Sequence, residues 1–178
     1  MIDIQLENEA EIIEKAKKDV RSFMLLYEHY LPRIYKYAYY QVIDKQEAED
    51  VVSQTFLQAM ENLHKYTYRG IPFGHWLYRI ASSIIYHGQR DRKNEFSTAD
   101  PVQLAGGEIV AEDRLDLLLL LRTLPGMQRE VLTLRYIQDL SIRDTARIMA
   151  CSEGSVKQLC YRAIKTLRER MNGNEEDR

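Results

Sequence analysis

The sequence has 178 residues, a formal net charge of −2 and a hydrophobic content of 45%. This length suits one mid-sized domain or two small ones, and the hydrophobic content is sufficient for a packed core. The longest apolar run, Leu117 to Leu121, is too short to cross a bilayer, and the N-terminus lacks a secretory signal pattern. We therefore expect a soluble, cytoplasmic protein without membrane insertion.

Charge is distributed unevenly along the chain. Residues 94–116 carry six acidic residues and one basic residue, whereas residues 117–171 carry ten basic and five acidic residues. A basic C-terminal block behind an acidic spacer is the kind of asymmetry that governs the choice of partners. Cys151 and Cys160 are interpreted as buried free thiols, because the sequence has no disulfide framework or metal-ligand spacing.

The N-terminal part of the chain is predicted to be helical, and no strand-like alternation is present. A charged helix is predicted over Ala10 to Lys18, and a tyrosine-rich helix over Phe23 to Tyr40. Pro32 lies inside the second helix and is expected to kink it or to mark a restart. The tyrosines are interpreted as core residues at a solvated edge.

A third helix is predicted to begin at Asp44, a good N-cap, with Glu47 completing a capping-box pattern. Its predicted buried stripe consists of Ala48, Val52, Phe56, Ala59 and Leu63. Another face carries Glu47, Asp50, Gln54, Gln58 and Glu61. That acidic and polar face is either solvated surface or a docking surface for a basic partner.

An aromatic loop follows, because residues 65–74 read K-Y-T-Y-R-G-I-P-F-G with three loop-forming Gly and Pro residues. The next helix is predicted to begin near His75. One side of it carries Arg79, Ser83, Tyr86, Arg90 and Lys93. Rings beside cations suit single-stranded nucleic acid, because bases stack on the rings while cations hold the phosphates. Core aromatics beside a solvated basic helix end are the alternative.

Residues 94–111 have weak periodicity, a proline and a Gly-Gly pair, and they are predicted to form a flexible acidic linker. A second helical unit is expected from Glu112 onward. Its last two helices are predicted to form a helix-turn-helix, the first beginning after Ser141 and the second with Ser152 as its N-cap. The final helix should bury Val156, Cys160, Ala163, Ile164, Leu167 and Met171.

The opposite face of that final helix is basic and carries Lys157, Gln158, Tyr161, Arg162, Lys165 and Arg168. Two short helices joined by a tight turn, the second with a basic outer face, fit a DNA major groove. An ordinary helical pair with a solvated basic face is the alternative interpretation.

Four motifs occur in a distinctive order. They are E-A-E-D-V-V-S-Q-T-F, F-G-H-W-L-Y-R-I-A, L-P-G-M-Q-R-E-V-L-T-L-R-Y and S-E-G-S-V-K-Q-L-C-Y-R-A. This order resembles a bacterial RNA polymerase sigma factor of the extracytoplasmic-function (ECF) type, over about residues 20–171. The resemblance implies an all-α fold of two small helical domains joined by a flexible acidic linker, the C-terminal one a helix-turn-helix.

The resemblance also implies a role for each part of the chain. Residues 1–93 would form the domain for polymerase docking and the −10 element, residues 94–111 the linker, residues 112–172 the −35 domain and residues 173–178 a disordered tail. The expected polymerase-docking residues are Glu47, Asp50 and Gln54. The expected −10 binding and melting residues are Tyr66, Tyr68, Phe73, Trp76, Arg79, Ser83, Tyr86 and Arg90. The expected −35 residues are Arg135, Ser155, Lys157, Gln158, Tyr161, Arg162 and Lys165.

Some residues depart from the family pattern. Ala150 stands where glycine is common at the turn, and Ser83 and His87 replace frequent Asn and Asp residues. Lys157 replaces a frequent arginine and is a less specific bidentate reader of bases. These departures leave the fold expectation unchanged but leave the promoter sequence open.

The expected function is therefore that of a sigma factor. It would bind core RNA polymerase through the β′ clamp helices and the β subunit, and recognise promoter DNA. An anti-sigma factor is a further expected partner, and no cofactor or metal is expected. The alternative is a stand-alone helix-turn-helix regulator that binds duplex DNA as a dimer. An enzyme is not expected, because the sequence has no phosphate-cradling glycine loop, nucleophile elbow or metal constellation.

Overall fold

A computed structural model describes residues 8–95 and 112–173. Across those two ranges the regular secondary structure is entirely helical, which confirms the expected all-α class. Contacts between Cα atoms divide the chain into two compact units, Met1–Leu104 and Ala105–Arg178. Of the predicted linker, residues 94–111, the part after Glu95 lies outside the described residues. Residues 174–178 of the predicted tail also lie outside them.

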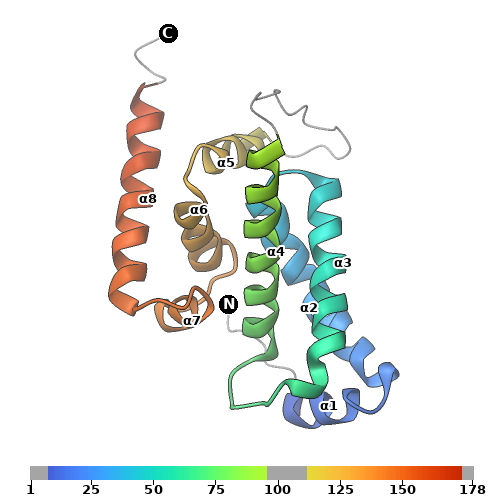
Figure 1. The fold of residues 1–178 in the computed structure, drawn as a ribbon. Coiled ribbons are helices and arrows are strands. Elements are labelled where there is room, and N and C mark those ends of the chain that lie inside the picture. The colour runs from blue at the N-terminus through green and yellow to red at the C-terminus, as the bar shows by residue number, and fades with distance from the viewer. Residues whose placement is uncertain (1–7, 96–111, 174–178) are drawn as a thin grey trace. The chain divides into compact units, whose positions relative to one another are not determined.

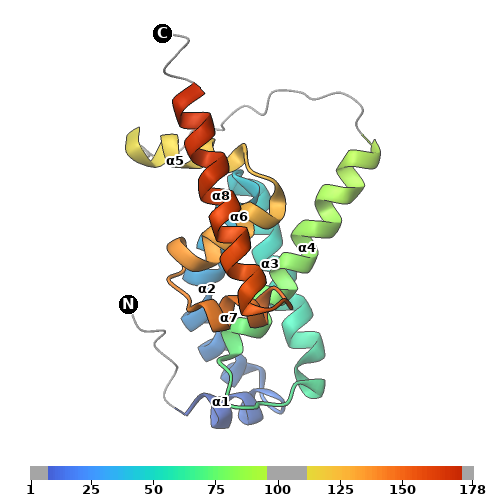
Figure 2. The same ribbon diagram turned by 90° about the vertical axis from the view of Figure 1, so that its left-hand side faces the viewer.

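Unit 1 contains α1 (Glu9–Ala16), α2 (Val20–Val42), α3 (Lys45–Asn62) and α4 (Phe73–Glu95). Helices α2, α3 and α4 pack against one another, and α1 packs against α2 (Figure 1). A short 3-10 turn, Leu63–Lys65, ends α3 and leads into the aromatic loop. Figure 2 shows the C-terminal half of α4 leaning away from α2 and α3. The side of α4 that carries Arg79, Ser83, Tyr86 and Arg90 is exposed and is here called the open side.

Local sequence explains the boundaries of these helices. The Asp44 carboxylate accepts a hydrogen bond from the Glu47 backbone N–H at 2.8 Å, so the predicted cap of α3 is confirmed. Asp19 caps α2 in the same way through the Arg21 N–H at 3.0 Å. Helix α2 continues through Pro32 without interruption, so the restart considered for that position does not occur.

The core of unit 1 is rich in aromatic side chains. All five residues of the stripe predicted on α3 are buried. Phe56 of this stripe makes an edge-to-face pair with Tyr27 of α2, with 4.7 Å between ring centroids, and Tyr37 of α2 makes a similar pair with Tyr78 of α4 at 5.2 Å. Such pairs favour fixed ring orientations, so the unit has a rigid interior.

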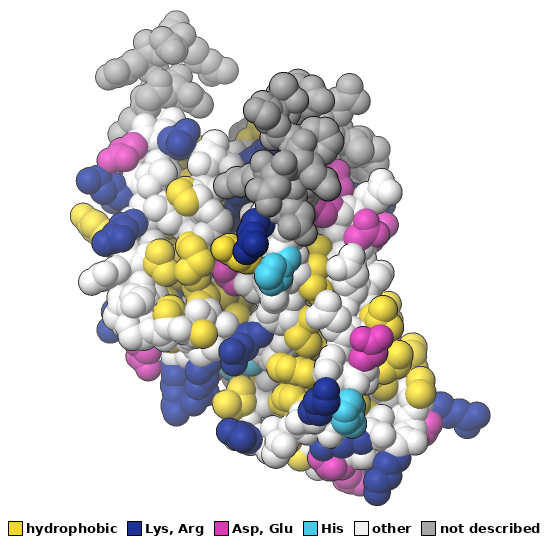
Figure 3. Space-filling model, viewed as in Figure 1, with side chains coloured by type: hydrophobic (Ala, Val, Ile, Leu, Met, Phe, Trp, Pro, Cys, Tyr) yellow, Lys and Arg dark blue, Asp and Glu magenta, His cyan; other side chains and the backbone are white. Residues whose placement is uncertain are grey.

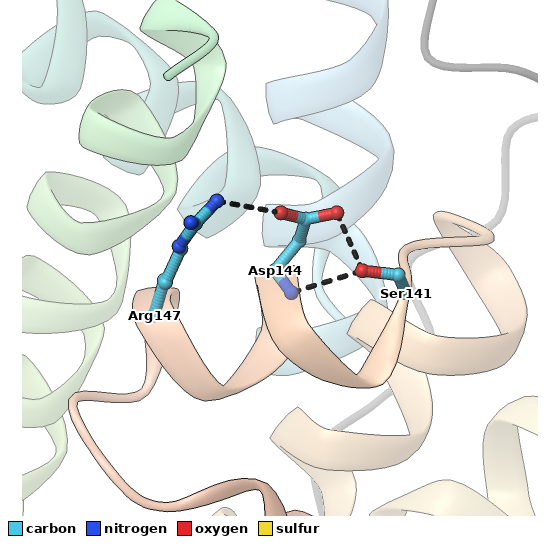
Figure 4. Close-up of polar contacts among 3 residues, drawn as sticks. All are labelled: Ser141, Asp144 and Arg147. Atoms are coloured by element: carbon cyan, nitrogen blue, oxygen red, sulfur yellow. Dashed lines mark hydrogen bonds and ion pairs between the residues drawn. The ribbon is translucent and has the colours of Figure 1, made fainter. Parts of the chain in front are cut away.

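Unit 2 contains α5 (Glu112–Arg122), α6 (Gly126–Leu132), a π-helical turn (Thr133–Ile137), α7 (Ile142–Ile148) and α8 (Glu153–Gly173). Helix α8 packs against α6 and α7. The Ser141 hydroxyl accepts from the Asp144 N–H at 3.0 Å, and Asp144 also pairs with Arg147 (Figure 4). Ser152 accepts from the Ser155 N–H at 3.1 Å, so the predicted N-cap of α8 is confirmed.

The turn between α7 and α8 is a Schellman motif built on an alanine. The Cys151 N–H donates to the Ala146 carbonyl at 3.0 Å, and the Ala150 N–H donates to the Arg147 carbonyl at 3.4 Å. Ala150 has a φ of 51°, in the left-handed region that favours glycine. The position at which the sequence lacks the family's glycine is therefore one where the backbone is strained.

Candidate nucleic-acid and polymerase interfaces

Three aromatic rings form a cluster, here called the ring cluster, where the loop enters α4. It consists of Tyr66, Phe73 and Trp76, whose ring centroids lie 4.7 Å (Tyr66–Trp76), 5.2 Å (Tyr66–Phe73) and 5.3 Å (Phe73–Trp76) apart. Tyr66 and Trp76 are half-buried. Desolvation, with smaller contributions from Glu9 and Tyr68, raises the pKa of Tyr66 from its ordinary value of 10.0 to about 12.

Within the ring cluster, Phe73 differs from its neighbours. Its side chain is fully buried (0% exposed), so it offers no ring face to a base. The buried Phe73 ring contacts both Tyr66 and Trp76, and its place in the −10 site stays a prediction. Tyr68, also on the loop, is half-buried and keeps some accessible surface.

A surface pocket of about 490 Å³ adjoins the ring cluster. It is lined by Gln58, Asn62, Lys65, Tyr66, Thr67, Arg69, Trp76 and Ile80. Pockets of roughly 300–1,000 Å³ accommodate small planar ligands. Asn62, Lys65 and Arg69 were not among the predicted site residues. Lys65 and Arg69 had a signal in the sequence, since these cations flank the two tyrosines of residues 65–69, whereas Asn62 had none.

The open side of α4 carries the remaining residues expected at the −10 element. Arg79, Ser83, Tyr86 and Arg90 are all exposed, and the Tyr86 side chain has 64% of its surface accessible. The side chain of Lys93, noted on the same side, lies outside the described residues. The helix thus presents two cations and an uncovered ring on one side.

A second hollow, of about 410 Å³, lies between α3 and α4. Its α3 wall includes Glu47, Asp50 and Gln54, and its α4 wall includes Ser83 and His87. Asp50 and Gln54 are exposed, whereas Glu47 is half-buried. The structure therefore brings the expected polymerase-docking residues and one expected −10 residue into a single groove.

The outer face of α8 is exposed along its length, whereas Val156 and Ala163 on the inner face are fully buried. Figure 3 shows Lys and Arg side chains over α8 and acidic side chains along α3. The exposed α8 residues are Lys157, Gln158, Tyr161, Arg162, Lys165 and Arg168. The Tyr161 ring is 71% exposed, which is unusual for an aromatic residue without a partner surface.

Several other residues in unit 2 differ in exposure from what the sequence predicted or make contacts that stabilise the fold. Arg135 is half-buried, and its guanidinium donates to the Leu140 carbonyl, which braces the turn before α7. Ser155 is half-buried, and its hydroxyl lies 2.9 Å from that of Ser152. Of the predicted inner face of α8, Met171 is exposed.

The two cysteines are free and only half-buried, which corrects the expectation that both thiols are buried. Burial raises the pKa of each thiol, so the reactive thiolate is scarce at neutral pH. Within residues 8–95 and 112–173, no group of three potential metal ligands occurs. None of the helices described there is long and apolar enough to span a membrane.

Comparison with known proteins identifies both units. Residues 26–95 match sigma-70 region 2, and residues 114–167 match sigma-70 region 4. The ECF RNA polymerase sigma factor BldN of Streptomyces coelicolor is 37% identical over 167 residues, covering 88% of this chain and 63% of BldN. The chain thus spans less than two thirds of BldN. The ECF sigma factor SigM of Bacillus subtilis is 27% identical, covering 83% of this chain and 93% of SigM.

A solved structure shares the fold. The sigma factor RpoE of Bartonella quintana, solved in complex with the anti-sigma factor NepR, has a TM-score of 0.74 and 24% identity, covering 85% of this chain and 98% of that chain. The ordered pair of sigma regions and the sequence matches define the class of protein. The chain belongs to the sigma-70 family of RNA polymerase sigma factors and is of the ECF type.

Proposed function

We propose that this chain binds core RNA polymerase, directs it to promoters with −35 and −10 elements, and opens the DNA at the −10 element. One observation carries the proposal. The chain combines a ring cluster beside a cation-lined pocket in the region 2 match with an exposed basic helix in the region 4 match. Residues 1–93 and 112–172 serve as the two functional domains, joined through residues 94–111.

The pocket beside the ring cluster is assigned to an extruded base of the −10 element. Removing a base from the duplex costs a few kcal/mol, and stacking on a protein ring returns roughly 1–3 kcal/mol per base. Tyr66 and Trp76 supply the ring faces, while Lys65 and Arg69 on the pocket wall supply charge for the adjoining phosphates. Tyr68 adds ring surface on the same loop.

The open side of α4 is assigned to the DNA strand that leads into this pocket. Arg79 and Arg90 contact phosphates, Tyr86 stacks or packs against a sugar, and Ser83 contributes a hydrogen bond. Ser83 lines the same groove as the proposed polymerase-docking residues, which supports a path for the strand close to them. There, Asp50 and Gln54, with Glu47 behind them, bind the basic β′ clamp helices of core polymerase.

The outer face of α8 is assigned to the major groove of the −35 element. Arg162 and Gln158 suit bidentate contacts to base edges, whereas Lys157 and Lys165 suit phosphates or single acceptors. Tyr161 provides an exposed ring for apolar contact with a thymine methyl or a sugar. Arg135 and Ser155, which brace the fold, contribute at most their remaining N–H and O–H groups to phosphates.

The remaining features of the proposal follow from family membership. The β subunit of polymerase is a second docking partner, and an anti-sigma factor holds the chain inactive until it is needed. The chain works in the cytoplasm, without a cofactor, and has no catalytic residues of its own because the polymerase carries out the chemistry.

The test is reconstitution with core polymerase. The purified chain is added to core enzyme, and initiation is mapped on a library of genomic fragments from the source organism. We expect start sites preceded by one shared pair of sequence elements. The alternative, a stand-alone dimeric regulator, predicts tight binding to a palindromic duplex without polymerase. That outcome, together with failure to bind core enzyme, would overturn the proposal.

A further inference from the structure

A buried carboxylate joins three helices of unit 1. Glu9, at the start of α1, has only 2% of its surface exposed. One of its oxygens accepts a hydrogen bond from the Tyr30 hydroxyl of α2. The other accepts from the backbone N–H of Phe73 at 3.1 Å, across 64 positions of sequence.

Phe73 is the first residue of α4, which explains why that contact matters. The first N–H groups of a helix lack partners within the helix and need an external acceptor. The residues just before Phe73 are Ile71 and Pro72, whose side chains cannot accept a hydrogen bond. Glu9 therefore caps α4 from a distant helix, and its negative charge suits the positive end of the helix dipole.

Tyr30 fixes the same junction from the other side. Its ring is 2% exposed and lies 6.0 Å from the Phe73 ring, centroid to centroid. At Gly74 the backbone approaches so closely that an added Cβ would lie 2.5 Å from Tyr30 Cε1. The Tyr30 ring is thus confined between α1 and the first turn of α4, with its hydroxyl directed to Glu9.

The junction supports the ring cluster directly. The Phe73 ring contacts both Tyr66 and Trp76, so fixing the Phe73 backbone fixes the base of the cluster. The charge of Glu9 also contributes, after desolvation, to the raised pKa of Tyr66, which places the carboxylate near that phenol. Glu9 itself lies outside residues 26–95, the part that matches sigma-70 region 2.

We propose that Glu9 is a positioning residue for DNA opening: by capping α4 and holding Tyr30, it keeps Trp76 and Tyr66 in place to receive a base. The inference rests on the proposed function for its consequence in transcription. Its structural part can be tested on the free protein.

The first test uses Trp76, the single tryptophan of the chain, as a fluorescent reporter. Glu9→Ala should move its emission to longer wavelength and make it more accessible to acrylamide. Glu9→Gln, which keeps an acceptor for the Phe73 N–H, should lie between Glu9→Ala and wild type. Glu11→Ala is the matched control, since Glu11 is an exposed carboxylate of the same helix paired with Lys15 at 2.7 Å. Emission of Glu9→Ala identical to wild type would overturn the inference.

The second test measures opening of a −10 element by the reconstituted holoenzyme. Loss of a buried charge-assisted hydrogen bond predicts that Glu9→Ala lowers the opening rate about 10-fold to 100-fold. Binding to core polymerase should stay within about twofold of wild type, a difference well under 1.4 kcal/mol. Leu26→Val, a core change in α2, controls for lost stability and should open the promoter normally below its melting temperature.

The outcomes separate the inference from the proposed function. If wild type and Glu9→Ala open the promoter at equal rates, the inference is overturned and the proposed function stands. Equal losses in Glu9→Ala and Leu26→Val would also overturn it, because stability alone would then explain the effect. If the wild-type protein opens no promoter, the proposed function is wrong, and so is the role of Glu9 in opening. The Trp76 fluorescence still tests the structural part, that Glu9 holds the start of α4 in place.

Discussion

The two units of this chain differ in their content of aromatic residues and in how far those residues are buried. Unit 1 buries several aromatic rings in its interior, among them Tyr30, Tyr37 and Phe73, and Tyr66 and Trp76 lie half-buried against Phe73. Unit 2 contains only two aromatic residues, Tyr136 and Tyr161, and both are exposed. The contrast matches the two tasks proposed. Opening DNA requires rings held rigidly against unstacking forces, whereas reading a duplex requires charge and hydrogen-bond donors on one helix.

The largest expected effects separate docking from reading. Asp50→Arg should weaken binding to core polymerase by about 100-fold or more, because it places like charges together at a docking surface. Binding of the free chain to a −35 duplex should not change. Glu61→Arg, farther along the same exposed side of α3, is the control and should bind core polymerase nearly normally. The measurement is fluorescence anisotropy with labelled core enzyme.

The reciprocal change is Arg162→Ala in unit 2. Loss of a bidentate base contact is worth roughly 1–3 kcal/mol, so recognition of the −35 element should fall about 10-fold to 100-fold. Core binding should be preserved, and Arg170→Ala near the end of α8 should behave like wild type. If Asp50→Arg and Arg162→Ala both lose core binding equally, the division between the units is wrong.

A matched pair of glycines in α4 tests the packing of unit 1. Gly74→Ala should destabilise the unit by about 1–3 kcal/mol, because the new methyl group meets the confined Tyr30 ring. Gly88→Ala should stabilise it by about 0.5–1 kcal/mol, since no atom lies within 4 Å of the new Cβ. Urea unfolding followed by Trp76 fluorescence reports on this unit, and two changes of the same sign would refute the packing argument.

The strained turn of unit 2 gives a smaller effect. Ala150→Gly should stabilise the helix-turn-helix by about 1 kcal/mol, because glycine adopts the left-handed φ of 51° without steric strain. Ala163→Gly, inside α8, should instead destabilise by about 1 kcal/mol. Hydrogen exchange of α7 and α8 amides measures both. No gain in protection in Ala150→Gly would show that the turn carries no strain.

The smallest expected effect is a pH dependence of unit 1. The pKa of Tyr66 is about 12 in the folded state, compared with about 10 for an unfolded chain. The neutral phenol therefore contributes stability that is fully present below about pH 10 and is lost as the pH rises toward 12. Tyr66→Phe should lose less stability between about pH 9 and pH 11 than wild type. Tyr161→Phe is the control, and an unchanged pH dependence in Tyr66→Phe would contradict the assignment.

Features that depend on neighbours in sequence could be predicted without the structure. The caps at Asp44 and Ser152 follow from residues three positions away, and the buried stripe of α3 follows from helical periodicity. The exposed basic face of α8 follows from the same periodicity. Each of these patterns lies within one helix, so tertiary packing had little opportunity to override it.

Features that depend on distant segments could not be predicted. Glu9 lies just before the charged helix predicted over Ala10 to Lys18, and nothing local marked it as important, because its partners Tyr30 and Phe73 lie 21 and 64 residues away. Phe73 was grouped with the loop aromatics, although the junction buries its ring completely. The contact between the Arg135 guanidinium and the Leu140 carbonyl spans only five residues, but it was missed as well, because it depends on the conformation of the turn before α7.

One measurement tests the division of labour most directly: transcript yield from a fully duplex promoter and from the same promoter with its −10 element already unpaired. Trp76→Ala should be impaired about 10-fold or more on the duplex template and largely restored on the unpaired one, since stacking of an extruded base is worth roughly 1–3 kcal/mol. Arg162→Ala should be impaired on both templates. The opposite pattern would contradict the account. In that pattern the transcript yield with Arg162→Ala is restored on the unpaired template, whereas Trp76→Ala is impaired to the same degree on both templates.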